Sequence, residues 1–144
     1  MDLLLICRDA LASSFATNLL TAMEAKKAGV DVAIFFTEEA VEALADGAIL
    51  NWPQGLTGMH KRIKMADSAV ASGLPIKGGK GQGREFDPKQ LVGQAVQFGV
   101  PMYACPLWTG LLKAKDSLPE GIKVLDNSTA LKALREAKTV VGSL

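Results

Sequence analysis

The sequence predicts a three-layer, doubly wound α/β domain with a mainly parallel sheet of about five strands. Short apolar runs alternate along the chain with longer stretches of helical periodicity. The apolar runs are almost uninterrupted, which is typical of strands that helices cover on both faces. The 144 residues are too few for a barrel of eight strand–helix units, and no repeat or linker divides them. We therefore expect one flavodoxin-like domain over residues 1–144, built with right-handed crossovers.

The first 47 residues predict two strand–helix units. Residues 2–7, "DLLLIC", read as a buried strand, and residues 9–27 carry one apolar stripe at helical spacing. Residues 30–36, "VDVAIFF", form the second predicted strand. Thr37 is the expected N-cap of the next helix, and Gly47 is expected to end that helix.

Residues 48–85 interrupt this alternation. A helix is expected over about residues 57–71, and the rest of the segment reads as loop. A long excursion of this kind indicates either a lid or an oligomer contact. Four apolar side chains favour the oligomer contact, because the segment is expected to offer them little local core: Leu50, Trp52, Leu56 and Met59.

Regular alternation resumes at Asp87 and Pro88, a good N-cap and first-turn pair. The expected helices span about residues 87–98, 106–115 and 127–137. The expected strands are "VPMYAC" at 100–105, "IKVLD" at 122–126 and "TVVGS" at 139–143. Asn127 or Ser128 is the expected cap of the last helix.

The composition excludes several classes of protein. A net charge of +1 gives no overall field that would attract nucleic acid or an anionic membrane. No apolar run approaches the roughly 18 residues of a membrane span, and the N-terminal residues lack the pattern of a signal peptide. Two cysteines make no disulfide framework, so we expect a cytoplasmic protein with reduced thiols.

Both cysteines are expected at the carboxyl ends of strands, where parallel sheets bind their ligands. Cys105 ends the "VPMYAC" strand, and a helix is expected to start at Pro106. Backbone amides and the dipole of that helix would favour the thiolate and lower the pKa of the thiol. From the residues alone, a reactive thiol and a packed structural cysteine are equally good interpretations.

The chain resembles the DsrE/DsrF family of small sulfur-relay proteins, which includes the TusD subunit. The resemblance rests on the opening unit, "LLLICRDALASSFATNLLTAMEAKKAGVDVAIFFTEEAVEAL", and on "VPMYACPLWTGLLKAK". It implies that Cys105 carries sulfur as a persulfide. It further implies a sulfurtransferase-type activity, a sulfur donor or acceptor protein as partner, and a homo-oligomer, either a trimer or a multiple of one. The glycine-rich "GGKGQGRE" has no counterpart in the family pattern.

Cys7 is a candidate second thiol for a persulfide on Cys105. In the strand order 2-1-3-4-5 the first and third strands are neighbours, which would bring the two cysteines close together. A packed core cysteine is the alternative. Trp108 is expected either to wall a small pocket beside Cys105 or to pack in the core.

Candidate anion-binding or ligand-binding residues are Arg8, Lys80 and Arg84. A single histidine, His60, supports neither a metal site nor a nucleophilic triad, and we expect no metal and no cofactor.

Two functions remain open at this point. The first is a sulfur carrier that holds a persulfide on Cys105 and passes it to a partner thiol. The second is a non-catalytic oligomeric module that binds a small anion or a nucleotide at the strand-end cleft, in which Arg8, Lys80 and Arg84 would matter more than Cys105.

Overall fold

The computed structural model describes residues 1–45, 48–74 and 86–142, and its centre is a fully parallel sheet in the order β4-β3-β2-β1-β5. The strands are β1 (Leu3–Cys7), β2 (Val32–Phe36), β3 (Met102–Ala104), β4 (Ile122–Val124) and β5 (Thr139–Gly142). The predicted three-layer α/β class and the five strands are confirmed. The expected neighbourhood of the first and third strands is wrong, because β2 lies between β1 and β3.

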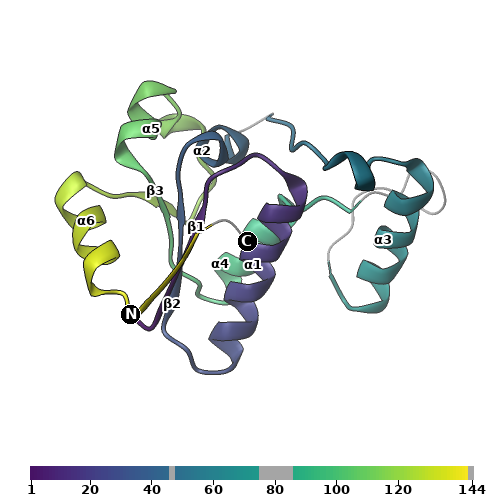
Figure 1. The fold of residues 1–144 in the computed structure, drawn as a ribbon, viewed down its shortest axis with the longest axis horizontal. Coiled ribbons are helices and arrows are strands. Elements are labelled where there is room, and N and C mark those ends of the chain that lie inside the picture. Colours follow the sequence, from purple (N-terminus) through teal and green to yellow (C-terminus); the bar gives the residue numbers. More distant parts are fainter. Residues whose placement is uncertain (46–47, 75–85, 143–144) are drawn as a thin grey trace.

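Helices cover both faces of this sheet (Figure 1). They are α1 (Ala12–Lys27), α2 (Glu39–Leu44), α3 (Met59–Ala71), α4 (Gln90–Gln97), α5 (Pro106–Leu111) and α6 (Asn127–Glu136), with short 3-10 turns η1 (Gln54–Leu56) and η3 (Lys115–Ser117). From β1 to β4 each strand is added on the same side, and the chain then returns to place β5 beyond β1. Right-handed crossovers in opposite directions put their helices on opposite faces, so α1 and α4 cover one face and α6 the other.

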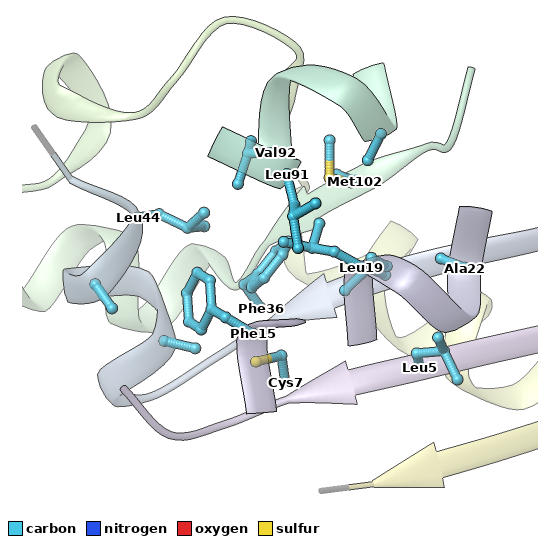
Figure 2. Packing of buried hydrophobic residues seen from close by; sticks show 14 of the residues in the cluster. Leu5, Cys7, Phe15, Leu19, Ala22, Phe36, Leu44, Leu91, Val92 and Met102 are labelled. Atoms are coloured by element: carbon cyan, nitrogen blue, oxygen red, sulfur yellow. The ribbon is translucent and has the colours of Figure 1, made fainter. Parts of the chain in front are cut away.

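Two apolar clusters hold these layers together. The larger cluster joins α1, α2 and α4 to one face of the sheet, and Figure 2 shows Phe15, Phe36 and Cys7 at its centre. The rings of Phe15 and Phe36 lie 5.5 Å apart between centroids. The smaller cluster, on the α6 face, is built on Leu4, Ala33, Phe35 and Ala130. Alternate residues of β1 and β2 therefore enter different clusters, as the two-residue period of a strand requires.

Several helix boundaries differ from those expected, among them the start of α4 at Gln90, where Lys89 rather than Asp87 is the N-cap residue. The first helix starts at Ala12 rather than Asp9, since the Asp9 carboxylate accepts the amide of Leu11 in a turn before the helix. The cap of α6 is Asp126, whose side chain accepts the amide of Thr129 at 2.9 Å. The helix after Cys105 ends at Leu111, and Lys113 then takes a positive φ of 51°.

Residues 48–74, the described part of the segment that interrupts the alternation, pack partly against the larger cluster. Figure 1 shows α3 standing apart from the sheet, at the end of the long connection from α2. Leu50 is nevertheless buried in the larger cluster, and Trp52 packs against that cluster and against Phe86. The expectation that these two side chains lack a core is wrong, whereas Met59 is 62% exposed. Within the described ranges, no helix has the length and apolar character needed to cross a membrane.

Candidate functional site

The site is built on a row of four residues that continue the sheet by one position beyond its strands. The amides of Thr37, Cys105 and Leu125 bond to the carbonyls of Cys7, Phe36 and Ala104, respectively. The strand register pairs Cys7 with Phe36 and Phe36 with Ala104, so Arg8, Thr37, Cys105 and Leu125 stand side by side in that order. We call them the edge row. They lie at the carboxyl edge of the sheet, where a parallel sheet binds ligands.

Cys105 is the accessible thiol of the molecule. It is partly exposed, and it packs against the smaller cluster on the α6 face. It is also the N-cap residue of α5, with an extended backbone, and its carbonyl accepts the amide of Thr109 at 2.9 Å. Its thiol makes no capping hydrogen bond to α5 in this structure. The side chain is therefore placed to meet a reagent from solvent.

Cys7 has the opposite environment. It is completely buried in the larger cluster (Figure 2). Cys105 packs against the smaller cluster, on the other face of the sheet. Burial is the main cause that raises the pKa of the Cys7 thiol to about 12, and the Asp9 carboxylate adds to that effect. With β2 between their strands and a different cluster around each, the two sulfur atoms are not neighbours. The expectation that the two thiols lie close together is therefore wrong, because the strand order separates them.

Arg8, at one end of the edge row, forms a bidentate ion pair with Glu38. Nε donates to Oε1 at 3.0 Å, and Nη2 lies 2.9 Å and 3.2 Å from the two carboxylate oxygens. The Arg8 side chain is 54% exposed. Two parallel N–H donors on one carboxylate are the geometry in which a guanidinium binds planar or tetrahedral oxyanions.

Glu38, the acidic partner in this ion pair, has a strained backbone conformation. Its φ of 55° and ψ of −133° lie where residues other than glycine are rarely found, and it follows the central strand of the sheet. Such conformations cost about 1–3 kcal/mol and gather at functional sites. The sequence predicts Thr37 as the N-cap of α2, and this is wrong, because Glu38 is the N-cap residue. No pattern in the sequence indicates the strained backbone of Glu38.

Thr109 is a second residue that the sequence analysis did not single out. It is 3% exposed, the only buried residue of the described α5, and its hydroxyl has no hydrogen-bond partner in the structure. The helix α5 packs beside α2, and Thr109 is buried in it one turn after Cys105. The one feature of the sequence that could have indicated Thr109 is its spacing of four residues from Cys105, because residues four apart lie on the same face of a helix.

Of the remaining candidates, those that the structure describes are not gathered around Cys105. Trp108 packs against the larger cluster, whereas Cys105 packs against the smaller one. His60 is exposed on α3, which stands apart from the sheet (Figure 1). Lys80 and Arg84 lie outside the described residues. In the described part of the chain, no three His, Cys, Asp or Glu side chains come together as a metal site would require.

A cleft of about 390 Å³ opens beside α2 at the same edge of the sheet. Its lining includes Glu39 and Glu42 together with Ala10 and Asn51, and it does not include Cys105. Two carboxylates in one small cleft repel an anion. The cleft therefore disfavours the small anion or nucleotide that a binding module would hold there.

Comparison with known proteins supports the fold and goes no further. The ychN protein from E. coli matches with a TM-score of 0.63 and 16% identity, over 99% of this chain and 98% of that one. A conserved protein of unknown function, BT1422 from Bacteroides thetaiotaomicron, matches with a TM-score of 0.60 and 12% identity, over 98% and 93%. No protein-family model and no curated protein matches the sequence. At these identities the likeness shows a shared fold and nothing about function.

Proposed function

We propose that this protein is a sulfur carrier that holds a persulfide on Cys105. The observation that carries the proposal is the contrast between the two thiols. Cys105 is partly exposed at the carboxyl edge of the sheet, and Cys7 is sealed in the core with a raised pKa. A thiolate is the reactive form of a cysteine, and it needs access to its donor. Of the two thiols, Cys105 meets that requirement.

The transfer takes two balanced steps. The Cys105 thiol loses its proton to solvent, and the thiolate attacks the outer sulfur of a sulfane-sulfur donor. A new S–S bond forms on Cys105 while the donor's bond to that sulfur breaks, and the bonding pair leaves with the donor. A partner thiolate then attacks the outer sulfur, takes it, and leaves Cys105 as thiolate.

The start of α5 supplies donors for both anions. Pro106 has no amide proton, and the amide of Thr109 is bonded to the Cys105 carbonyl. An N-cap side chain accepts from the second and third residues of its helix, which here are Leu107 and Trp108. We expect the Cys105 thiolate and its persulfide to turn toward these two amides.

A partner surface adjoins the thiol. Leu107 and Leu111 on α5 are 60% and 65% exposed, and large exposed apolar side chains of this kind mark contact surfaces. We propose that a protein donor or acceptor docks over α5. We further propose a homo-oligomer, a trimer or a multiple of one, and a cytoplasmic location in which both cysteines stay free thiols, as they are in this structure.

Transfer from Cys105 is the test of this function. The protein is incubated with a sulfane-sulfur donor, freed of excess donor, and mixed with glutathione, and the sulfur released is measured per mole of protein. We expect close to one equivalent from wild type and from Cys7→Ala, and none from Cys105→Ser, because a hydroxyl is a weak nucleophile near neutral pH. Release from Cys105→Ser at the wild-type level would overturn the proposal.

A further inference from the structure

We infer that Arg8 recognises the anionic group of the sulfur donor and that Glu38 occupies Arg8 as an internal competitor until the donor binds. The inference rests on the proposed role of Cys105, and it adds the class of donor: a molecule that carries an oxyanion close to its transferable sulfur. Three observations support it, namely the order of the edge row, the geometry of the ion pair and the strain at Glu38.

The edge row places Arg8 within reach of the thiol. Arg8 and Cys105 stand on either side of Thr37 in the edge row, as the register of β1, β2 and β3 requires. Two strand spacings of about 4.8 Å put their backbones about 10 Å apart. Residues of one row on parallel strands point to the same face, and Cys105 packs on the α6 face. A long arginine side chain and a small donor together fill such a gap.

The ion pair shows what Arg8 is arranged to bind. Its guanidinium already holds a carboxylate through two donors, at 3.0 Å and 3.2 Å. A sulfonate or carboxylate on a donor presents the same pair of oxygens. The pair is exposed, and exposed ion pairs contribute little net stability. An arriving oxyanion therefore replaces Glu38 at small cost.

The backbone of Glu38 indicates why the carboxylate is held there at all. The structure keeps a glutamate in a conformation that favours glycine, at the end of the central strand. The ion pair with Arg8 contributes too little to explain that strain, so stability alone does not account for the residue. An internal competitor that keeps Arg8 oriented and lets go of it easily does account for it.

The loading step with thiosulfate illustrates the chemistry. The sulfonate oxygens bind Arg8, and the Cys105 thiolate attacks the outer sulfur. The Cys105 S–S bond forms, the S–S bond of thiosulfate breaks, and the bonding pair leaves as sulfite. The same arrangement suits glutathione persulfide, whose carboxylates would take the place of the sulfonate. Thiosulfate and glutathione persulfide are accordingly compared as separate donors.

The test measures anion binding without any sulfur transfer. Cys105 is alkylated with iodoacetate, an anion, and with neutral iodoacetamide, and the rates are read from the peptide that contains Cys105. We expect sulfate to slow iodoacetate saturably in wild type. In Arg8→Gln this protection should be lost, and Arg8→Lys, which keeps the charge without the fork, should restore part of it. In Glu38→Gln, half-protection should need about two- to fivefold less sulfate, the range that an exposed ion pair represents.

Matched controls separate binding from general charge effects. Glu120→Gln removes the same charge from an exposed position just before β4, at the opposite edge of the sheet, and Arg135→Gln removes a cation from the far end of α6. Both controls should protect like wild type. Sulfate protection that persists in Arg8→Gln would overturn the role of Arg8. Unchanged half-protection in Glu38→Gln would overturn the competition by Glu38.

The donors complete the design. Loss of loading by thiosulfate alone in Arg8→Gln assigns the sulfonate as ligand, and loss of loading by glutathione persulfide alone assigns the carboxylate. If wild type binds sulfate as expected but neither donor loads Cys105, the carrier function fails and the anion site stands. If both donors load Arg8→Gln at the wild-type rate, the anion site fails and the carrier function stands.

Discussion

The same substitution should have opposite consequences at the two cysteines. Cys7→Ser places a hydroxyl in an apolar cluster with no water access, since Cys7 is 0% exposed. The Cys7 sulfur lies 4.0 Å from the Asp9 carbonyl oxygen, and the shorter C–O bond of serine keeps the hydroxyl outside hydrogen-bond distance. An unpaired buried hydroxyl costs about 1–3 kcal/mol, which corresponds to a fall in Tm of roughly 3–12 °C for a chain of this size.

Cys105→Ser should cost less than about 1 kcal/mol, because that side chain is partly exposed at a strand end. Urea unfolding followed by circular dichroism gives the free energy of unfolding of both variants and of wild type. Sulfur loading of Cys7→Ser at a temperature where it stays folded should equal that of wild type. The structural role of Cys7 would be refuted if Cys7→Ser were as stable as wild type. It would also be refuted if Cys7→Ser lost less free energy of unfolding than Cys105→Ser.

Three further substitutions test other parts of the structure. Asp126→Ala should lower the stability of the protein, and Asp126→Asn should restore most of it. Hydrogen bonds lower the pKa of Asp126 in the folded state, so its contribution to stability is fully present above about pH 3.9 and is lost as the pH falls through that lower pKa. Equal acid-unfolding curves for wild type and Asp126→Ala would contradict the capping role. Gly121→Ala should lower the free energy of unfolding by about 2–4 kcal/mol, because Gly121 has a φ of 91° and an added Cβ would lie 2.6 Å from a Val96 methyl. Adding Val96→Ala to this variant should recover only the steric part of the loss. Unchanged stability of Gly121→Ala would contradict this turn geometry. Thr109→Val should raise the free energy of unfolding by about 1 kcal/mol by removing a buried hydroxyl that has no partner, and a loss of stability instead would mean that the hydroxyl is bonded.

The fold class and most elements follow from local pattern. Uninterrupted apolar runs identified β1 and β2, and glycines marked the helix ends, as at Gly29 and Gly99, which both take positive φ. The strand order did not follow, because several orders satisfy right-handed crossovers between buried strands. The order decided the relation of the two thiols, so that relation was the part of the site predicted wrongly.

The site itself was visible only in part. Cys105 was placed at a strand end by the run that precedes it and by Pro106 after it, and the structure keeps both features. The ion pair between Arg8 and Glu38 joins residues 30 positions apart, and the strain at Glu38 depends on how α2 leaves the sheet. Pair contacts and backbone strain of this kind are properties of the folded chain.

The position of a transferred sulfur tests most directly whether Cys105 is the carrier residue. The folded protein is treated with a sulfane-sulfur donor, digested under conditions that preserve persulfides, and analysed by mass spectrometry peptide by peptide. We expect one added sulfur on the peptide that contains Cys105, removable by reductant, and none on the peptide that contains Cys7. Sulfur on Cys7, or no uptake by protein that circular dichroism shows to be folded, would contradict the carrier role of Cys105.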